Sequence, residues 1–309
     1  MAHARNLARR PEIAPSFRLS NSQREALVAV GFLAPGLLIF LIFSLGPTVF
    51  SLVMSFTSWN GLGTPLWTGF ENYIQLLRDS VFVTSLGNTM LFTIEFVVLC
   101  TVCSTCLAVA LNRRFRGVSI VRLMWFLPIV TDMISISLVW AWLYDRNFGI
   151  INYVIGLFGL PAQSWLSDTR WALFSLVLLS AWRWAGYYAI ILLAALQGVP
   201  QELYEAAIID GAKPWQKFRR ITLPLISPAI FFVVTLSVIS SFQVFEQMWV
   251  MTQGGPENST ISIAMYLYEQ AFQFLNMGYA SAVSWVLFFI IFAVTLLNWR
   301  IRRLWVFES

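Results

Sequence analysis

The stretch Glu205-Ala-Ala-Ile-Ile-Asp-Gly211, followed by Ile221-Thr-Leu-Pro224, is a polar and basic connection between two long apolar segments. Pro200 suits the first turn of a helix, and Gly211 suits a left-handed cap at the end of that helix. A second short helix can begin at Pro214. The first helix would extend about 16 Å. The sequence therefore predicts a projecting helical knob that is offered to a partner in water beside a membrane.

The whole chain is more apolar than a soluble domain requires. Of its 309 residues, 58% are hydrophobic and 11% are charged, whereas an average fold has about 25% charged residues. Six apolar stretches are long enough to cross a bilayer as helices, which takes about 20 residues each. We place these spans at Leu27–Met54, Leu86–Leu111, Val121–Tyr144, Ala172–Leu196, Leu225–Met251 and Ala280–Trp299.

These spans predict an all-α membrane protein with six transmembrane helices. Residues 27–303 would form the transmembrane domain, with a cytoplasmic loop at residues 197–224. The polar residues 1–26 and the short segment 304–309 would be tails. The first apolar run is too long for the core of a cleavable signal, so we expect it to remain as a membrane span.

The basic residues predict the orientation. Sixteen of the 20 lie in the N-terminal tail, the connection between the second and third spans, the Glu205 loop and the C-terminal tail. The opposite connections contain Arg78, Arg146 and Arg170, and Arg183 lies within a span. Because cytoplasmic loops carry the excess of Lys and Arg, both termini and the Glu205 loop are predicted to be cytoplasmic. Topology thus explains the net charge of +5, and no nucleic-acid-binding face is expected.

The spacing Glu-Ala-Ala, three residues, Gly, then Ile-x-Leu-Pro resembles the cytoplasmic coupling loop of binding-protein-dependent ABC importer permeases. Three further segments, Phe126-Leu-Pro128, Phe148-Gly-x-x-Asn152 and Met251-Thr-Gln-Gly-Gly-Pro256, are similar to the carbohydrate-uptake branch, which includes the maltose and glycerol-phosphate systems. The resemblance covers Leu27 to Arg303. It implies the type I ABC importer permease fold in the bacterial plasma (inner) membrane.

The resemblance also implies partners. A second six-helix permease chain would complete the pathway, two copies of an ATPase subunit would sit beneath it, and an external solute-binding protein would deliver the solute. This chain has no Gly-x-x-x-x-Gly-Lys-Ser/Thr phosphate loop, so ATP and Mg would be bound by the partner ATPase. No cofactor is expected in this chain, and membrane lipid would surround it.

Two other classes of function are weighed against a transport subunit. A membrane enzyme is disfavoured because the single histidine is His3, in the tail, which leaves the membrane without a Ser-His or metal-histidine site. A protease that uses two facing carboxylates would need a pair such as Asp132 with Glu95, and no motif supports that pair. An independent channel or secondary carrier usually shows two related halves and more helices. The six spans therefore predict half of a pathway.

The resemblance assigns roles to residues of the Glu205 loop. The Glu205 carboxylate would pair with a basic group of the ATPase, or else with Arg219 in this chain. Gly211 would let the two short helices turn. The remaining residues of the predicted ATPase-coupling surface are Leu203, Ala206, Ala207, Ile208 and Asp210, and Leu223 and Pro224 would rejoin the loop to the fifth span.

Ionisable residues within spans are costly and usually face a cavity or a partner. The sequence has four of them, Glu95, Asp132, Arg183 and Glu246. A sugar would need aromatic faces and polar groups together, so the predicted substrate pathway contains Asp132, Arg183, Tyr187, Tyr188, Gln243 and Glu246. The alternative is a structural ion pair of Arg183 with Glu95 or Asp132. A single arginine favours a neutral sugar over glycerol phosphate or glycerophosphodiesters.

Overall fold

The computed structural model describes residues 20–113 and 115–307. By their contacts, the residues divide into two units, 1–51 and 52–309. By length and composition, four helices of the described part can cross a membrane. Two bent helix pairs raise that number to six, Val118–Val130 with Met133–Leu143 and Pro214–Leu225 with Ser227–Phe242, the second bent by 67°. The predicted all-α, six-span membrane fold is therefore confirmed, with two spans broken. The orientation of the termini stays a prediction.

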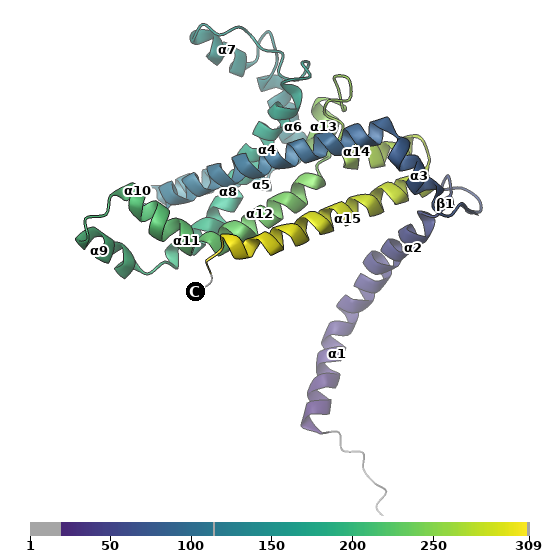
Figure 1. Ribbon diagram of the computed structural model, residues 1–309, viewed down its shortest axis with the longest axis horizontal. Coiled ribbons are helices and arrows are strands. Elements are labelled where there is room, and N and C mark those ends of the chain that lie inside the picture. Colours follow the sequence, from purple (N-terminus) through teal and green to yellow (C-terminus); the bar gives the residue numbers. More distant parts are fainter. Residues whose placement is uncertain (1–19, 114, 308–309) are drawn as a thin grey trace, which may run out of the picture. The chain divides into compact units, whose positions relative to one another are not determined.

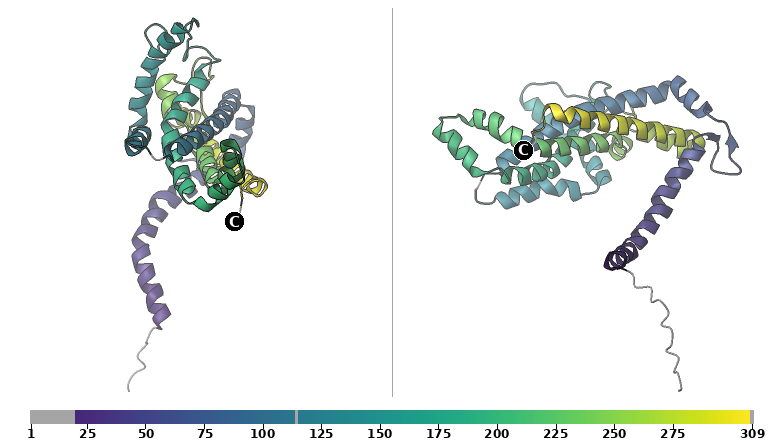
Figure 2. Two further views of the ribbon diagram at one scale, coloured as in Figure 1. Left: turned by 90° about the vertical axis from the view of Figure 1, so that its left-hand side faces the viewer. Right: turned by 60° about the horizontal axis from the view of Figure 1, so that its bottom comes forward.

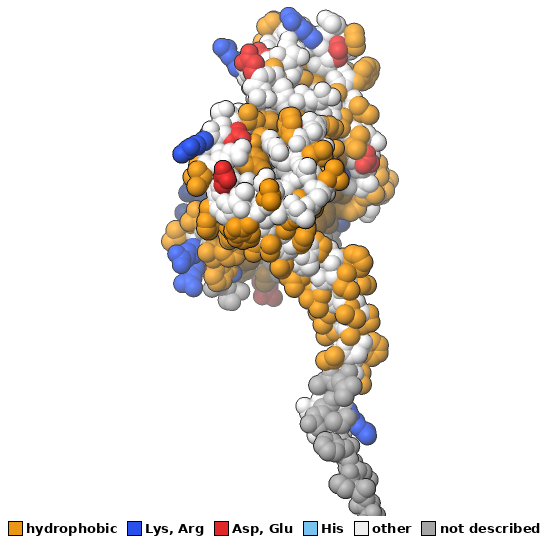
Figure 3. Space-filling view, turned by 90° about the vertical axis from the view of Figure 1, so that its right-hand side faces the viewer, with side chains coloured by type: hydrophobic (Ala, Val, Ile, Leu, Met, Phe, Trp, Pro, Cys, Tyr) orange, Lys and Arg blue, Asp and Glu red, His pale blue; other side chains and the backbone are white. Residues whose placement is uncertain are grey.

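The first unit is a helical rod. It consists of α1 (Asn21–Phe40) and the π-helical turn η1 (Leu41–Leu45), and it leads into α2 (Gly46–Met54). The π turn precedes Pro47, which has no N–H to continue the regular ladder. Its apolar side chains are exposed, with Phe32 84% and Phe43 74% accessible, and they cover the rod in Figure 3. Such a surface requires lipid or another chain around it.

The second unit is built on long helices that pack side by side (Figures 1 and 2). Helix α4 (Ser80–Leu111) packs against α8 (Ala172–Gln197) and α12 (Ser227–Phe242), and α12 packs against α15 (Met277–Ile301). Helix α15 ends in the short 3-10 turn η4 (Arg302–Leu304). Their shared core contains Phe92, Phe96, Leu176, Leu192, Val233 and Val283.

The third span is bent, so the prediction of one helix over Val121–Tyr144 is wrong. It consists of α5 (Val118–Val130) and α6 (Met133–Leu143), which meet at 103°. Pro128 cannot donate to the helical ladder, and Thr131 is extended. Asp132 then starts the new helix, because its Oδ2 accepts the Ser135 N–H at 3.0 Å.

The fifth span is broken too, so the predicted continuous helix over Leu225–Met251 is wrong. Helix α12 ends at Phe242, and α13 (Glu246–Met251) begins after a three-residue break at Gln243–Phe245. The Ser240 and Ser241 hydroxyls donate to carbonyls three residues earlier, a contact that bends helices. The Ser262 hydroxyl donates to the freed Val244 carbonyl at 2.6 Å and so stabilises the break.

Shorter elements connect the spans. Strands β1 (Thr57–Ser58) and β2 (Leu66–Trp67) pair antiparallel, with Thr57 opposite Trp67 and Ser58 opposite Leu66. The other connecting helices are α3 (Glu71–Arg78), α7 (Ile150–Leu157), α14 (Ile263–Tyr268) and the π turn η3 (Glu269–Gln273). Between α8 and α12 lie α9 (Gln201–Ile209), α10 (Pro214–Lys217), η2 (Phe218–Thr222) and α11 (Leu223–Leu225).

Asp79 joins three of these elements at the start of α4. Its Oδ1 accepts the N–H groups of Val81 and Phe82 at 2.9 and 3.1 Å. Its Oδ2 accepts the Tyr279 hydroxyl at 2.8 Å and the Tyr266 hydroxyl. Burial raises the pKa of Asp79, but these hydrogen bonds outweigh it and hold the pKa below its ordinary value. The carboxylate therefore ties α14 and α15 to the start of α4.

Candidate functional site

The loop between α8 and α12 contains the predicted knob. Helix α9 begins at Gln201, directly after Pro200, and α10 begins at Pro214 as predicted. Gly211 has a φ of +76°, which confirms the left-handed turn. The Ala212 N–H donates to the Ala207 carbonyl at 2.8 Å, and the Gly211 N–H donates to Ile208 at 3.0 Å. This pattern is a Schellman cap, and it ends α9 sharply.

Helix α9 presents its apolar side chains to the outside. Leu203 is 43% accessible, Ile208 58% and Ile209 87%. Glu205, Ala206 and Asp210 are exposed as well, whereas Ala207 is half-buried. Sequence reasoning missed Ile209, although an apolar residue just before the cap of a polar loop could have signalled it. Such exposed apolar residues are typical of a docking surface.

One hydrogen bond holds α9 to the chain that follows it. The Tyr204 hydroxyl lies 3.0 Å from the Thr222 hydroxyl of η2, and the sequence gave no sign of this contact. Leu223 and Pro224 begin α11, with Leu223 still 37% accessible. Among the described residues, no basic group lies within 4.0 Å of the Glu205 carboxylate, so the alternative pair with Arg219 is not formed.

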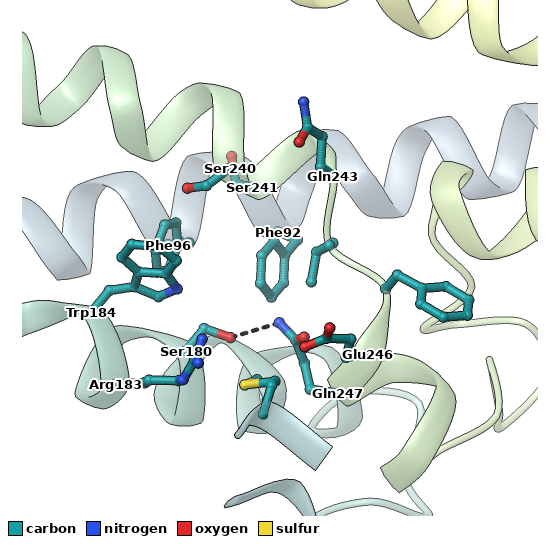
Figure 4. A pocket seen from close by; sticks show the side chains of 13 residues that line it. Phe92, Phe96, Ser180, Arg183, Trp184, Ser240, Ser241, Gln243, Glu246 and Gln247 are labelled. Carbon is teal, nitrogen blue, oxygen red and sulfur yellow. Dashed lines mark hydrogen bonds between the residues drawn. The ribbon is translucent and has the colours of Figure 1, made fainter. Parts of the chain in front are cut away.

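A pocket of about 300 Å³ lies where the broken spans meet (Figure 4). Arg183 and Trp184 of α8, Gln243 at the break and Glu246 of α13 line it. The structure thus brings together three of the six residues predicted for the pathway. The remaining lining residues are Phe92, Phe96, Met133, Ser180, Ser240, Ser241, Val244, Phe245 and Gln247.

The break in the fifth span brings to the pocket further polar residues that were not predicted from the sequence. Gln247 donates from Nε2 to the Ser180 hydroxyl at 3.1 Å, which joins α13 to α8 (Figure 4). Ser240 and Ser241 also line the pocket. Serines are common packing residues in membrane helices, so no sequence signal distinguishes Ser240 and Ser241. Gln247 shares with Gln243 the signal of a polar group within a span.

The other three predicted pathway residues lie outside the lining. Asp132 caps α6 at the bend of the third span. Tyr188 is buried, and its ring stacks on Trp184 with centroids 5.4 Å apart. Tyr187 is half-buried against the main core. Tyr187 and Tyr188 therefore support the wall behind Trp184.

Arg183 holds the bend of the third span. Its Nη2 donates to the carbonyl of Thr131 at 3.0 Å and to that of Ile129 at 3.5 Å. These carbonyls are freed where α5 ends, and a cation at a helix C-terminus is favourable. Across the described chain, no carboxylate lies within 4.0 Å of the guanidinium. Asp132 and Glu246 attract it from further away, so the alternative of a close ion pair with Glu95 or Asp132 is not formed.

Comparison with known proteins gives the following matches. A family model described as the binding-protein-dependent transport system inner membrane component matches residues 118–305. The arabinooligosaccharides transport system permease protein AraP of Halalkalibacterium halodurans is 36% identical and covers 91% of this chain and 88% of its own. The lactose transport system permease protein LacF of Rhizobium radiobacter is 33% identical, over 88% of this chain and 93% of its own.

A solved structure shows the same fold. It is the crystal structure of a bacterial alginate ABC transporter in complex with an alginate pentasaccharide-bound periplasmic protein. One of its chains matches with a TM-score of 0.79 at 21% identity, over 91% of this chain and 95% of that chain.

Proposed function

Because this chain belongs to the inner membrane components of binding-protein-dependent transport systems, the ABC transporter permeases, we propose that it forms half of the pathway through which a sugar or oligosaccharide enters the cell. The chain is a multi-pass inner-membrane protein. A second six-helix permease chain would supply the other half of the pathway. The named relatives transport arabinooligosaccharides and lactose, which supports a carbohydrate as the solute.

The single observation that carries this proposal is the pocket at two broken spans. Discontinuous helices expose backbone and polar groups inside a membrane, and transporters place substrate sites there. Phe92 and Trp184 offer apolar faces to a sugar ring, and Gln243 and Glu246 offer hydrogen-bond partners to its hydroxyls. The pocket is accordingly suited to a neutral, hydroxyl-rich solute.

The charges of the pocket favour a neutral sugar over glycerol phosphate or a glycerophosphodiester. Arg183 is the single cation among the lining residues, and its Nη2 is already engaged by two carbonyls. Glu246 adds a negative charge that would repel a phosphate. A phosphorylated solute would need further cations from the second permease chain.

The coupling of transport to ATP hydrolysis is assigned to α9. Its exposed Leu203 and Ile208, with Glu205 beside them, would dock on an ATPase subunit. ATP and Mg would be held by that subunit, with one copy under each permease chain, and this chain would have no catalytic role. An external solute-binding protein would deliver the sugar. The alginate transporter that shares this fold is in complex with a periplasmic protein that has an alginate pentasaccharide bound.

Reconstitution tests the proposal. The chain would be placed in proteoliposomes with its cognate permease, ATPase and binding protein. Lactose, an arabinooligosaccharide and glycerol phosphate would be offered separately. We expect ATP-dependent uptake of a sugar, and we expect Glu205→Lys to abolish it while the chain stays in the membrane. Uptake of glycerol phosphate and of neither sugar would contradict the assignment of the solute. Uptake by the Glu205→Lys variant at the wild-type rate would contradict the coupling role of α9.

A further inference from the structure

An apolar groove lies where the end of α4 meets α10, away from the pocket of the broken spans. Its volume is about 770 Å³. Ala110 of α4, Phe115 of the following connection, and Trp215 and Phe218 of the loop form much of its wall. The Trp215 and Phe218 rings lie 5.5 Å apart, and Trp215 is 66% accessible. An apolar wall this open needs an apolar occupant.

The chain segments that contain the lining residues of this groove are basic. Arg113 lines the groove directly. The two chain segments around its lining residues, 106–122 and 212–222, contain eight basic residues and no acidic residue. Arg116, Lys213, Arg219 and Arg220 are exposed in those segments. An apolar cavity that is lined by Arg113 and lies in basic chain segments matches a molecule that has an apolar chain and an anionic head.

The position of the groove fits a phospholipid of the cytoplasmic leaflet. Leu111 ends the long apolar helix α4, and Arg113 follows two residues later, so Arg113 lies at the level where a span meets the head groups. Trp215 has the amphipathic ring that prefers this level. The level is cytoplasmic in the orientation that the basic residues predict.

We propose that this groove binds one anionic phospholipid, with an acyl chain against Trp215 and Phe218 and its phosphate at Arg113. This inference rests on the proposed function, which supplies the cytoplasmic side of the groove and the effect of the lipid on coupling. Helix α10 begins three residues after Gly211, so a lipid that holds α10 against α4 also positions α9. Anionic lipid should therefore strengthen the coupling of solute binding to ATP hydrolysis.

The probe is phosphatidylglycerol, with the intact transporter in nanodiscs of phosphatidylcholine alone or with phosphatidylglycerol added. Native mass spectrometry after extraction would count retained phosphatidylglycerol. We expect Arg113→Gln with Trp215→Ala to lower retention about tenfold. The matched control, Arg78→Gln with Trp67→Ala, removes an exposed Arg and an exposed Trp from the opposite connection and should retain as much lipid as the wild type. Added phosphatidylglycerol should raise solute-stimulated ATP hydrolysis in the wild type and in the control variant. It should not raise it in the variant with Arg113→Gln and Trp215→Ala.

Two results would overturn the lipid site. Equal retention by the two double variants would mean that the lipid binds elsewhere. Cross-linking of Trp215→Cys to the ATPase polypeptide in the intact transporter would mean that protein covers the groove. If the wild type retains phosphatidylglycerol through Arg113 and Trp215 but no sugar stimulates hydrolysis in any lipid, the proposed function fails and the lipid site stands.

Discussion

Arg183 shows how a single charged residue is accommodated in this membrane domain. The sequence indicates that Arg183 needs a partner, and a carboxylate is the obvious choice. The structure instead gives it the carbonyls of Ile129 and Thr131, which the bend of the third span sets free. The same side chain lines the pocket. Arg183 therefore connects the backbone of the bend to the proposed sugar pathway.

Replacing Arg183 with alanine should weaken both the bend and transport. The loss of hydrogen bonds from a charged donor costs about 1.5–3 kcal/mol, and because Arg183 is half-buried we expect the lower end of that range. The thermal midpoint of the purified transporter and the rate of sugar uptake should both fall, while the ATPase still copurifies. Arg183→Lys keeps the charge without the planar fork and should be intermediate. An unchanged midpoint and uptake for Arg183→Ala would contradict both roles.

Asp79 gives a prediction about pH. Its folded-state pKa lies below the ordinary value, so its contribution to stability is complete above an unfolded pKa of about 3.9 and is lost as the pH falls through the folded pKa. At neutral pH, Asp79→Ala should cost about 1 kcal/mol through the lost cap of α4. Thermal melts from neutral to acidic pH should show the variant and the wild type converging below pH of about 4.

The control for Asp79 is Tyr279→Phe, which removes one hydrogen bond to the Asp79 carboxylate and leaves the cap of α4 in place. Its melting midpoint should fall less than that of Asp79→Ala at neutral pH. If the difference between Asp79→Ala and the wild type were the same at every pH, the charge of Asp79 would have no part in the stability.

At the scale of elements, apolar composition predicts where the chain crosses the membrane but not where a crossing helix breaks. The bend after α5 has a local signal in Pro128, whereas the break at Gln243–Phe245 contains neither proline nor glycine. That break depends on the Ser262 hydroxyl, which is distant in sequence and donates to Val244. The sequence could predict that Arg183, Gln243 and Glu246 lie together, because polar groups in spans are rare. The contact of Gln247 with Ser180 could not be predicted, because only the break makes the two residues neighbours.

A substitution in the turn between α9 and α10 can distinguish a loss of coupling from a loss of stability. A Cβ at Gly211 would meet no atom within 4 Å, so Gly211→Ala should cost only the left-handed strain of about 1 kcal/mol. Gly159 is a matched control, because its φ is +74° and its surroundings are equally open. Both variants should lose similar stability in thermal melts. Solute-stimulated ATP hydrolysis should fall in Gly211→Ala alone, and an equal fall in Gly159→Ala would contradict a coupling role for this turn.

At the scale of the whole molecule, the surfaces left uncovered indicate an assembly. The rod of α1 exposes apolar side chains along its length, which lipid or a second permease chain would cover. Helix α9 also exposes apolar side chains, but the exposed Glu202 and Glu205 lie among them, and carboxylates disfavour burial in lipid. Within the described residues, these two surfaces therefore call for different partners, and α9 calls for a protein in water.

The exposed end of α9 gives the last prediction. Ile209 is 87% accessible, and a buried isoleucine contributes about 1.5–3 kcal/mol relative to an exposed one. If Ile209 enters an apolar site on the ATPase, the Ile209→Asp variant would lose that contact and would also bury a charge. Binding of the ATPase should therefore weaken by about tenfold or more. Leu62→Asp is the matched control, because Leu62 is 74% accessible in the opposite connection. Pull-down of the ATPase should fail for Ile209→Asp and succeed for Leu62→Asp, since neither change disturbs a buried contact. Retention of the ATPase by both variants would mean that Ile209 lies outside the docking surface.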